Sequence, residues 1–123
     1  MTDPKYLGIP NICFSLTDKD DKREEKFIKQ RLQRGFDDTE TWSLRDTIAD
    51  FVVPRLELYI EKNCGCPMGM TFEGWNQILQ KILWSLKFIQ GIDEMNRTPT
   101  QAEWKEYQRG MKLFAKHFTE LWW

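Results

Sequence analysis

The sequence has few of the residues that mark catalytic and metal sites. Its 123 residues include one histidine and three cysteines. His117 is therefore the one obvious group for acid–base chemistry near neutral pH. Phosphate-binding loops, nucleophile elbows and the paired-histidine zinc motif are also missing from the chain. These absences predict that the protein is not an enzyme and needs no cofactor.

Long apolar stretches and an excess of one charge are also missing. Stretches without a charged or strongly polar residue, such as residues 82–86, are far shorter than the roughly 20 residues of a membrane span. Lysine and arginine total 18 against 19 acidic residues, so no uniform basic field attracts nucleic acid. The first residues lack the basic and apolar segments of a secretion signal, and an odd number of cysteines is typical of a reducing compartment. We therefore expect a cytoplasmic protein that binds neither membranes nor nucleic acid in general.

Aromatic residues, in contrast, are abundant. Six tryptophans and eight phenylalanines supply most of a 14% aromatic fraction. Each large ring buries roughly 150–250 Å², so they can build a firm core without disulfides or metal. With 41% hydrophobic and 30% charged residues, the chain has the composition of a folded protein. Its length fits one domain of about 100 to 150 residues.

Proline and glycine divide the chain near its start. Residues 1–16 contain two prolines and a glycine that resist helix formation, so we expect an extended arm there. Residues 17–123 are expected to form a single helical domain. Its first helix is predicted over the mostly charged residues 18–34, and Gly35 suits the left-handed position that closes a helix.

Apolar residues recur at helical spacing in the next segment, which contains Pro54 in its middle. The recurring apolar residues are Ile48, Phe51, Val52, Leu56, Tyr59 and Ile60. Proline removes one backbone hydrogen bond and crowds the preceding turn, so we expect a kink there. Glycine and proline then predict a loop over residues 63–70.

The strongest periodic segment follows Thr71 and is our candidate for the core helix, ending near Gly91. Its stripe consists of Trp75, Ile78, Leu79, Ile82, Leu86 and Ile89. A fourth helix is predicted to start at Pro99 and to run to the last residues, because Thr100 and Glu103 have the spacing of a capping box. No segment alternates convincingly with a period of two. We therefore predict an all-α protein, a compact bundle of about four helices.

Cys64-Gly65-Cys66 is the fragment that most resembles part of a metal site, with Cys13 and His117 as the available further ligands. Structural zinc sites usually combine two close pairs of ligands, and the chain has no second pair. Two thiols in a turn rich in glycine and proline are more often just turn residues. We therefore predict no bound metal.

Four residues are candidates for ligand binding, each with a structural alternative. Asp46 and Asp50 lie four residues apart on one helix face, where they either help to chelate a cation or are simply solvated. Arg55 lies among apolar residues, so it either clamps a small anionic ligand or pairs with a neighbouring acid. His117, close to two phenylalanines, is more simply a surface or boundary histidine.

Aromatic residues that do not fit a single core stripe indicate an interface. Trp84 and Phe88 lie four residues apart, away from the main stripe of their helix. Trp122 and Trp123 cannot both point inward, because adjacent helical residues diverge by about 100°. Since soluble monomers rarely expose large apolar patches, we expect a homo-oligomer with these four residues at its interface.

Four segments between residues 35 and 123 form a distinctive pattern. They are Asp38-Thr39-x-Thr41-Trp42-Ser43-Leu44, Thr47-Ile48-Ala49-x-Phe51-x-x-Pro54-Arg55-Leu56, Trp75-x-x-Ile78-Leu79-x-Lys81 and Gly110-x-x-Leu113-Phe114-x-Lys116-x-Phe118-x-x-Leu121-Trp122-Trp123. Together they resemble a family of small bacteriophage and prophage proteins. The resemblance implies phage origin and action in a bacterial cytoplasm, and it carries no assigned activity or catalytic residue.

Small phage proteins without catalytic motifs commonly act by binding. We therefore expect a non-enzymatic binding protein that counters a host defence, either by occupying a host protein or by sequestering a small nucleotide signal. The alternative is a virion or replication accessory protein with a structural role.

Overall fold

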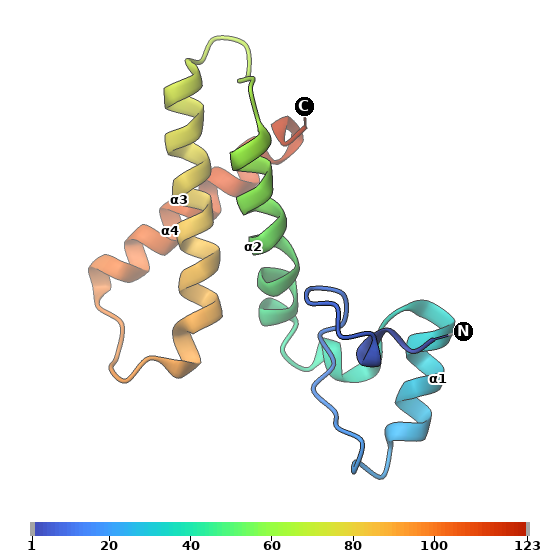
Figure 1. The fold of residues 1–123 in the computed structure, drawn as a ribbon. Helices are drawn as coiled ribbons and strands as arrows, with labels where there is room; N and C mark the ends of the chain where they lie inside the picture. Colours follow the sequence, from blue (N-terminus) through green and yellow to red (C-terminus); the bar gives the residue numbers. More distant parts are fainter. Residues whose placement is uncertain (1, 123) are drawn as a thin grey trace. The chain divides into compact units, whose positions relative to one another are not determined.

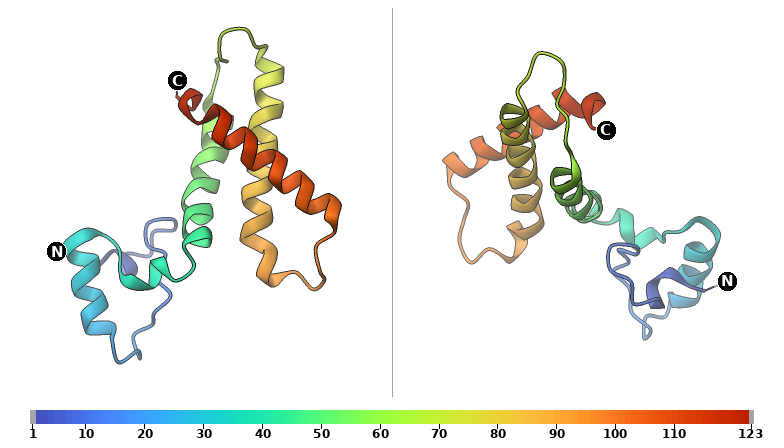
Figure 2. Two further views of the ribbon diagram at one scale, coloured as in Figure 1. Left: turned by 180° about the vertical axis from the view of Figure 1, so that it is seen from behind. Right: turned by 45° about the horizontal axis from the view of Figure 1, so that its top comes forward.

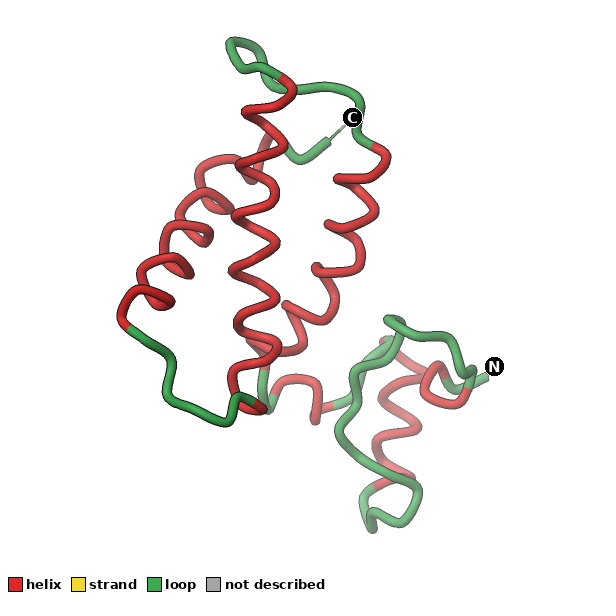
Figure 3. Tube along the Cα trace, turned by 60° about the vertical axis from the view of Figure 1, so that its left-hand side comes forward, coloured by secondary structure: helices red, strands yellow, loops and turns green. Residues whose placement is uncertain are grey.

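The computed structural model describes residues 2–122, which contain helices and no β-strand (Figures 1 and 3). The α-helices are α1 (Glu24–Arg34), α2 (Leu44–Lys62), α3 (Phe72–Gly91) and α4 (Gln101–His117). Short 3-10 helices are η1 (Pro4–Tyr6), η2 (Asp38–Thr41), η3 (Ile92–Glu94) and η4 (Phe118–Glu120). The predicted all-α fold with four helices is confirmed.

The chain divides into two compact units after Phe51. The first unit contains α1 and the beginning of α2, and the second contains the rest of α2 together with α3 and α4. The predicted division into an arm of residues 1–16 and one domain of residues 17–123 stays a prediction. No helix within residues 2–122 is long and apolar enough to cross a membrane.

The first unit is built from α1, the N-terminal arm and η2. Residues 18–23, predicted as the start of α1, form turns instead, because the carboxylates of Asp18 and Asp21 accept hydrogen bonds from nearby backbone N–H groups. The helix therefore begins at Glu24. Gly35 closes it in the left-handed conformation, with a φ of +87°, as predicted.

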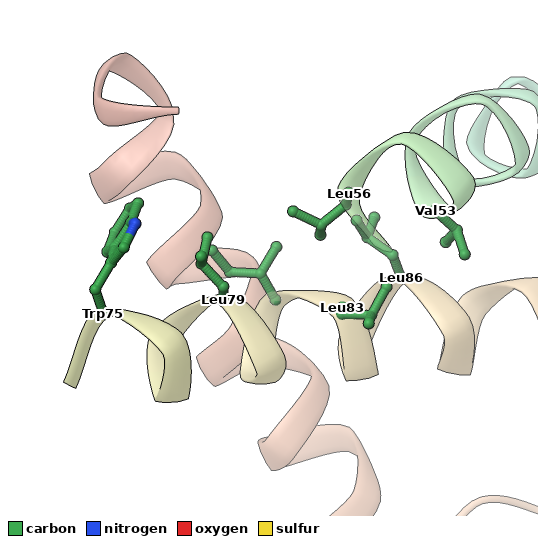
Figure 4. Close-up of a cluster of buried hydrophobic side chains, with 7 residues drawn as sticks. Val53, Leu56, Trp75, Leu79, Leu83 and Leu86 are labelled. Carbon is green, nitrogen blue, oxygen red and sulfur yellow. The ribbon is translucent and has the colours of Figure 1, made fainter. Parts of the chain in front are cut away.

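The core of the second unit is apolar and centred on α3 (Figure 4). It consists of Val53 and Leu56 from α2 and of Trp75, Leu79, Ile82, Leu83 and Leu86 from α3. Trp75 is 1% exposed and Ile82 is 0% exposed. The predicted stripe of α3 is confirmed as the buried face, except that Ile78 is only partly buried. Leu121 packs against the same cluster.

Helices α3 and α4 cross at close range (Figure 2). A Cβ atom on Gly110 would lie 1.8 Å from Ser85 Oγ and 2.5 Å from the carbonyl oxygen of Lys81. The Ser85 hydroxyl is buried and donates a 3.0 Å hydrogen bond to the carbonyl oxygen of Tyr107. Glycine at position 110 is therefore what allows the two backbones to approach.

Threonine side chains cap the N-termini of α3 and α4. Thr71 Oγ1 accepts a 2.9 Å hydrogen bond from Gly74 N, and Thr100 forms the predicted capping box with Glu103. Pro99 precedes this cap and does not occupy the first helical position. Helix α4 ends at His117, so the prediction that it reaches the last residues is wrong. Pro54 lies inside α2, and the kink there stays a prediction.

Candidate functional site

An apolar groove of about 420 Å³ lies in the first unit, beside the beginning of α2. Its apolar lining consists of Ile12, Phe14, Phe36, Leu44, Ile48 and Phe51. The remaining lining residues are Gly35, Glu40, Thr41 and Thr47. We call this hollow the α2 groove.

One wall of the α2 groove is a row of apolar side chains on α2. Leu44, Ile48 and Phe51 follow one another at steps of four and three residues, so they share one helix face. They are 53%, 48% and 48% exposed, whereas Ala49 on the opposite face is fully buried. The helical spacing that includes Ile48 and Phe51 therefore does not mark the buried face of α2, because Ala49 and Val53 take the buried positions.

The other wall comes from the arm and the loop before η2. The backbone N–H of Phe14 donates a 3.0 Å hydrogen bond to Glu40 Oε1, and the N–H of Leu16 donates a 2.8 Å bond to Thr39 Oγ1. Phe36 lies under the guanidinium of Arg34, whose central carbon is 4.5 Å from the ring centroid. The arm is thus fixed to η2 by its backbone, which leaves its apolar side chains to line the groove.

The first unit is held behind this wall by a buried ionic network around Arg31, whose side chain is fully buried. The guanidinium donates two hydrogen bonds of 2.8 and 2.9 Å to Asp3 and one of 2.6 Å to Asp37, and it also pairs with Glu24. The hydroxyl groups of Tyr6, Ser15 and Thr17 donate further hydrogen bonds to these carboxylates. We call this set the Arg31 network.

The Arg31 network shifts the ionisation of its members toward the charged forms. Hydrogen bonds from Arg31 lower the pKa of Asp3, and hydrogen bonds to Asp3, Asp37 and Glu24 raise the pKa of Arg31 despite its burial. Burial alone would raise the pKa of Glu24 and of Asp37, but their hydrogen bonds outweigh it and lower both pKa values. The network is therefore fully charged at neutral pH.

The electrostatic character of the α2 groove is set by acids around it. No lysine or arginine belongs to its described lining, and the one acid there, Glu40, already accepts backbone hydrogen bonds from Phe14 and Asp37. Residues 36–51 carry five acidic side chains and one arginine, and three of these acids, Asp37, Asp38 and Asp46, pair with Arg31, Arg34 and Arg45. The groove can thus hold apolar groups, and a small net negative charge on its unit, with 11 acidic and 9 basic side chains in residues 1–51, favours positive charge at their edges.

A second hollow, of about 410 Å³, lies in the second unit where the loop between α2 and α3 meets the C-terminal segment. Its lining consists of Tyr59, Asn63, Gly65, Cys66, Pro67, Met68, Trp75, Glu120 and Trp122. Tyr59 donates a 3.3 Å hydrogen bond to the carbonyl oxygen of Trp122, and burial raises the pKa of Tyr59. We call it the C-terminal pocket.

His117 lies behind the wall of the C-terminal pocket. The side chain is buried, its ring centroid is 5.5 Å from that of Trp75, and Nδ1 lies 2.9 Å from Glu120 Oε1. The prediction of a surface or boundary histidine is therefore wrong, because η4 folds Glu120 back over the ring. The imidazole joins α3 to the C-terminal segment.

The other sequence-based ligand candidates are divided between the two units. Asp46 accepts a 2.6 Å hydrogen bond from Ser43 Oγ and lies 3.3 Å from Arg45 Nε, so it stabilises the start of α2. Asp50 is partly buried one turn later, also in the first unit. Arg55 is exposed on α2 and, like His117, belongs to the second unit. Their roles in binding stay predictions.

The aromatic residues predicted for an interface differ in exposure. Trp84 is 38% exposed and Trp122 is 76% exposed. Phe88, in contrast, is buried, because it stacks on Trp84 with ring centroids 5.2 Å apart and Trp104 covers its edge at 5.3 Å. The prediction that Phe88 lies at an interface is therefore wrong. Phe88 instead packs beneath Trp84 and Trp104. Trp123 lies outside the described residues.

Within residues 2–122, no group of three or more His, Cys, Asp or Glu side chains is placed to hold a metal ion. Cys64 and Cys66 are exposed, and Cys13 belongs to the first unit, so it does not join them in one compact unit.

No protein-family model matches the chain, and no curated protein or solved structure matches it. The candidate site therefore depends on geometry and chemistry alone.

Proposed function

We propose that the protein is a non-enzymatic binding protein that holds an amphipathic helix of another protein in the α2 groove. The observation that carries this proposal is the exposed row of Leu44, Ile48 and Phe51, which faces apolar residues of the arm and of the loop before η2. Grooves of this kind receive helices that present apolar residues at steps of three and four. Covering the row would remove its apolar surface from water, which favours association.

Charge favours a partner that differs from this chain. Residues 36–51 carry a net negative charge that ion pairs of Asp37, Asp38 and Asp46 with arginine only partly offset, so two copies joined through the α2 groove would bring like charges together. A helix with basic residues beside its apolar face would instead be attracted to the groove. We therefore place a basic amphipathic helix in it, on a protein of the bacterial host that the phage-like sequence pattern implies.

The same features make an anionic small molecule a weaker candidate. Phosphate groups are usually held by arginine, lysine or the N-terminus of a helix. Neither the α2 groove nor the C-terminal pocket has lysine or arginine in its described lining, and each contains a glutamate. A third hollow, of about 570 Å³ beside α1, has Lys22, Arg23, Lys26 and Lys29 in its lining, so sequestration of a nucleotide signal stays the alternative and would use that hollow.

Site-specific photo-crosslinking in bacterial cells tests the proposal. A photoreactive phenylalanine analogue replaces Ile48 in the groove or, as a control, Leu58, which lies on the same helix outside the groove and is 53% exposed. We expect a heterologous adduct from position 48 and none from position 58, with the crosslinked peptide belonging to a basic amphipathic helix. A synthetic copy of that helix should bind the protein, and Phe51→Asp and added salt should weaken the binding.

Two results would contradict the proposal. One is equal crosslinking from both positions, which would indicate non-specific contact with an apolar surface. The other is an adduct at position 48 that contains a second copy of this chain, because the groove would then be an interface of a homo-oligomer.

A further inference from the structure

The C-terminal pocket combines aromatic rings with a carboxylate. Its aromatic lining residues are Tyr59, Trp75 and Trp122, its one acidic residue is Glu120, and its described lining contains no lysine or arginine. The faces of aromatic rings attract cations, those of tryptophan most strongly, and a carboxylate adds a full negative charge. This composition therefore suits a cation that also has apolar surface.

Direct contacts join the aromatic residues of the pocket. Trp75 is 1% exposed, and its side chain is hydrogen-bonded to that of Tyr59. The Tyr59 hydroxyl in turn donates the 3.3 Å hydrogen bond to the carbonyl oxygen of Trp122. Burial raises the pKa of Tyr59, so this ring is neutral at physiological pH. Trp122 is 76% exposed, so its indole offers aromatic surface to a ligand.

The carboxylate of the pocket is positioned by its own neighbours. Glu120 Oε1 lies 2.9 Å from Nδ1 of the buried His117, whose ring packs against Trp75 with centroids 5.5 Å apart. The carbonyl oxygen of Glu120 accepts a 3.0 Å hydrogen bond from the N–H of Trp122, so the acid and the exposed indole belong to one turn. Because His117 contacts Oε1, the second carboxylate oxygen, Oε2, is left for a ligand.

We propose that the C-terminal pocket binds a methylated ammonium group, with Glu120 beside its charge and the three aromatic rings around its methyl groups. A primary ammonium has three N–H donors that need acceptors, whereas the amide of Asn63 is already hydrogen-bonded within its own loop. A methylated ammonium lacks most of these donors, and its methyl groups pack against aromatic faces. The volume of about 410 Å³ lies in the range of small-molecule sites.

Titration of the full chain with choline, followed by nuclear magnetic resonance, tests the proposal. We expect saturable binding that moves the N-methyl signal of choline upfield, because aromatic ring currents shield methyl groups above the ring faces. The uncharged isostere of choline, in which carbon replaces the nitrogen, should bind about tenfold more weakly. A primary alkylammonium should also bind more weakly than choline, because its N–H groups lose water without enough acceptors in the pocket.

Substitutions in the pocket separate the contribution of the rings from that of the charge. Trp122→Ala should lower the affinity for choline about tenfold, and Trp122→Phe should restore part of it. Glu120→Gln should lower the affinity about fivefold while it keeps a hydrogen-bond partner for His117. Trp42→Ala is the matched control, because Trp42 is 55% exposed but belongs to the first unit, and this variant should bind choline as the wild type does.

Two results would overturn the site. Equal affinity for choline and for its uncharged isostere would mean that the pocket recognises apolar shape and not charge. Unchanged choline binding by Trp122→Ala, with the circular dichroism of the wild type, would place the ligand elsewhere on the chain. All lining residues of the pocket belong to the second unit, so these results do not depend on the α2 groove.

Discussion

The two units of this protein bury different kinds of side chain. Among the described residues, the buried side chains of the first unit are mostly polar or charged. They are Thr17, Glu24, Arg31, Asp37, Thr39 and Glu40, beside only two buried hydrophobic residues, Phe27 and Ala49. In the second unit, nine buried hydrophobic residues accompany three buried polar ones. The first unit is therefore organised by the Arg31 network and the second by an apolar core.

Because of this difference, different kinds of substitution should destabilise the two units. A buried ionic network has strict requirements for geometry and charge, and loss of one partner leaves the others uncompensated. An apolar core depends instead on shape and volume. The α2 groove belongs to the unit with few buried apolar residues, so its apolar side chains remain available to a partner.

Removal of the central cation should have the largest effect. Arg31→Met keeps much of the side-chain volume but leaves Asp3, Glu24 and Asp37 buried without their counter-charge. We expect the free energy of unfolding to fall by about 3 to 5 kcal/mol. Denaturant titration measures this, and Arg34→Met, at a half-exposed arginine of the same helix, is the control that should change little.

Truncation of the apolar core should have a comparable or smaller effect. Ile82 is fully buried at the centre of the α3 stripe, so Ile82→Ala should cost about 2 to 5 kcal/mol through lost burial and a residual cavity. A loss below about 1 kcal/mol in denaturant titration would mean that the core of the second unit is not centred on α3.

A larger side chain at the crossing of α3 and α4 should cause the next largest loss of stability. Gly110→Ala places a methyl group 1.8 Å from Ser85 Oγ, so the helices must separate, at a cost of about 1 to 3 kcal/mol. Gly91→Ala is the matched control, since a Cβ atom there meets nothing within 4 Å. Equal melting temperatures for the two variants would contradict the close crossing.

Acid should destabilise the first unit selectively. Because the pKa values of Asp3, Glu24 and Asp37 are lowered in the folded protein, their contribution to stability is complete above the ordinary values of 3.8 and 4.5. It is lost as the pH falls below those values and through the folded pKa values. Circular dichroism between pH 7 and pH 2 should therefore show partial loss of helix first. A single transition in which the whole helical signal is lost together would contradict the selective unfolding of the first unit.

The smallest effect is expected for a substitution at an exposed tryptophan, which should change self-association. Trp84 is partly exposed and Trp122 is largely exposed, so we predict a homo-oligomer that buries them. Sedimentation at micromolar concentration should show a dimer or larger species, and Trp84→Glu should shift it toward monomer. A wild-type protein that stays monomeric at high concentration would leave Trp84 and Trp122 available to other partners.

Features encoded by local sequence were predictable. The start and buried face of α3 follow from Thr71 and from residues spaced by three and four, and the start of α4 follows from Thr100 and Glu103. Gly35 likewise indicated the end of α1. In each case the physical cause lies within a few residues of the feature, so one sequence contains the whole signal.

Features that depend on distant residues were not predictable. Arg31 has the sequence of a surface arginine near a helix end, and it is buried because Asp3 and Asp37 reach it from outside the helix. The α2 groove was missed because Ile48 and Phe51 have the same chemistry as core residues. The spacing of Leu44, Ile48 and Phe51 was visible, but which face of α2 would be covered was not.

Hydrogen exchange of Arg31→Met at pH 7, measured peptide by peptide, tests the central claim most directly. The claim is that the Arg31 network organises the first unit while an independent apolar core organises the second. We predict that residues 24–34 lose protection, whereas residues 75–89 and 101–117 exchange as in the wild type. Equal loss of protection in all three segments would contradict the claim, because the chain would then unfold as one cooperative domain.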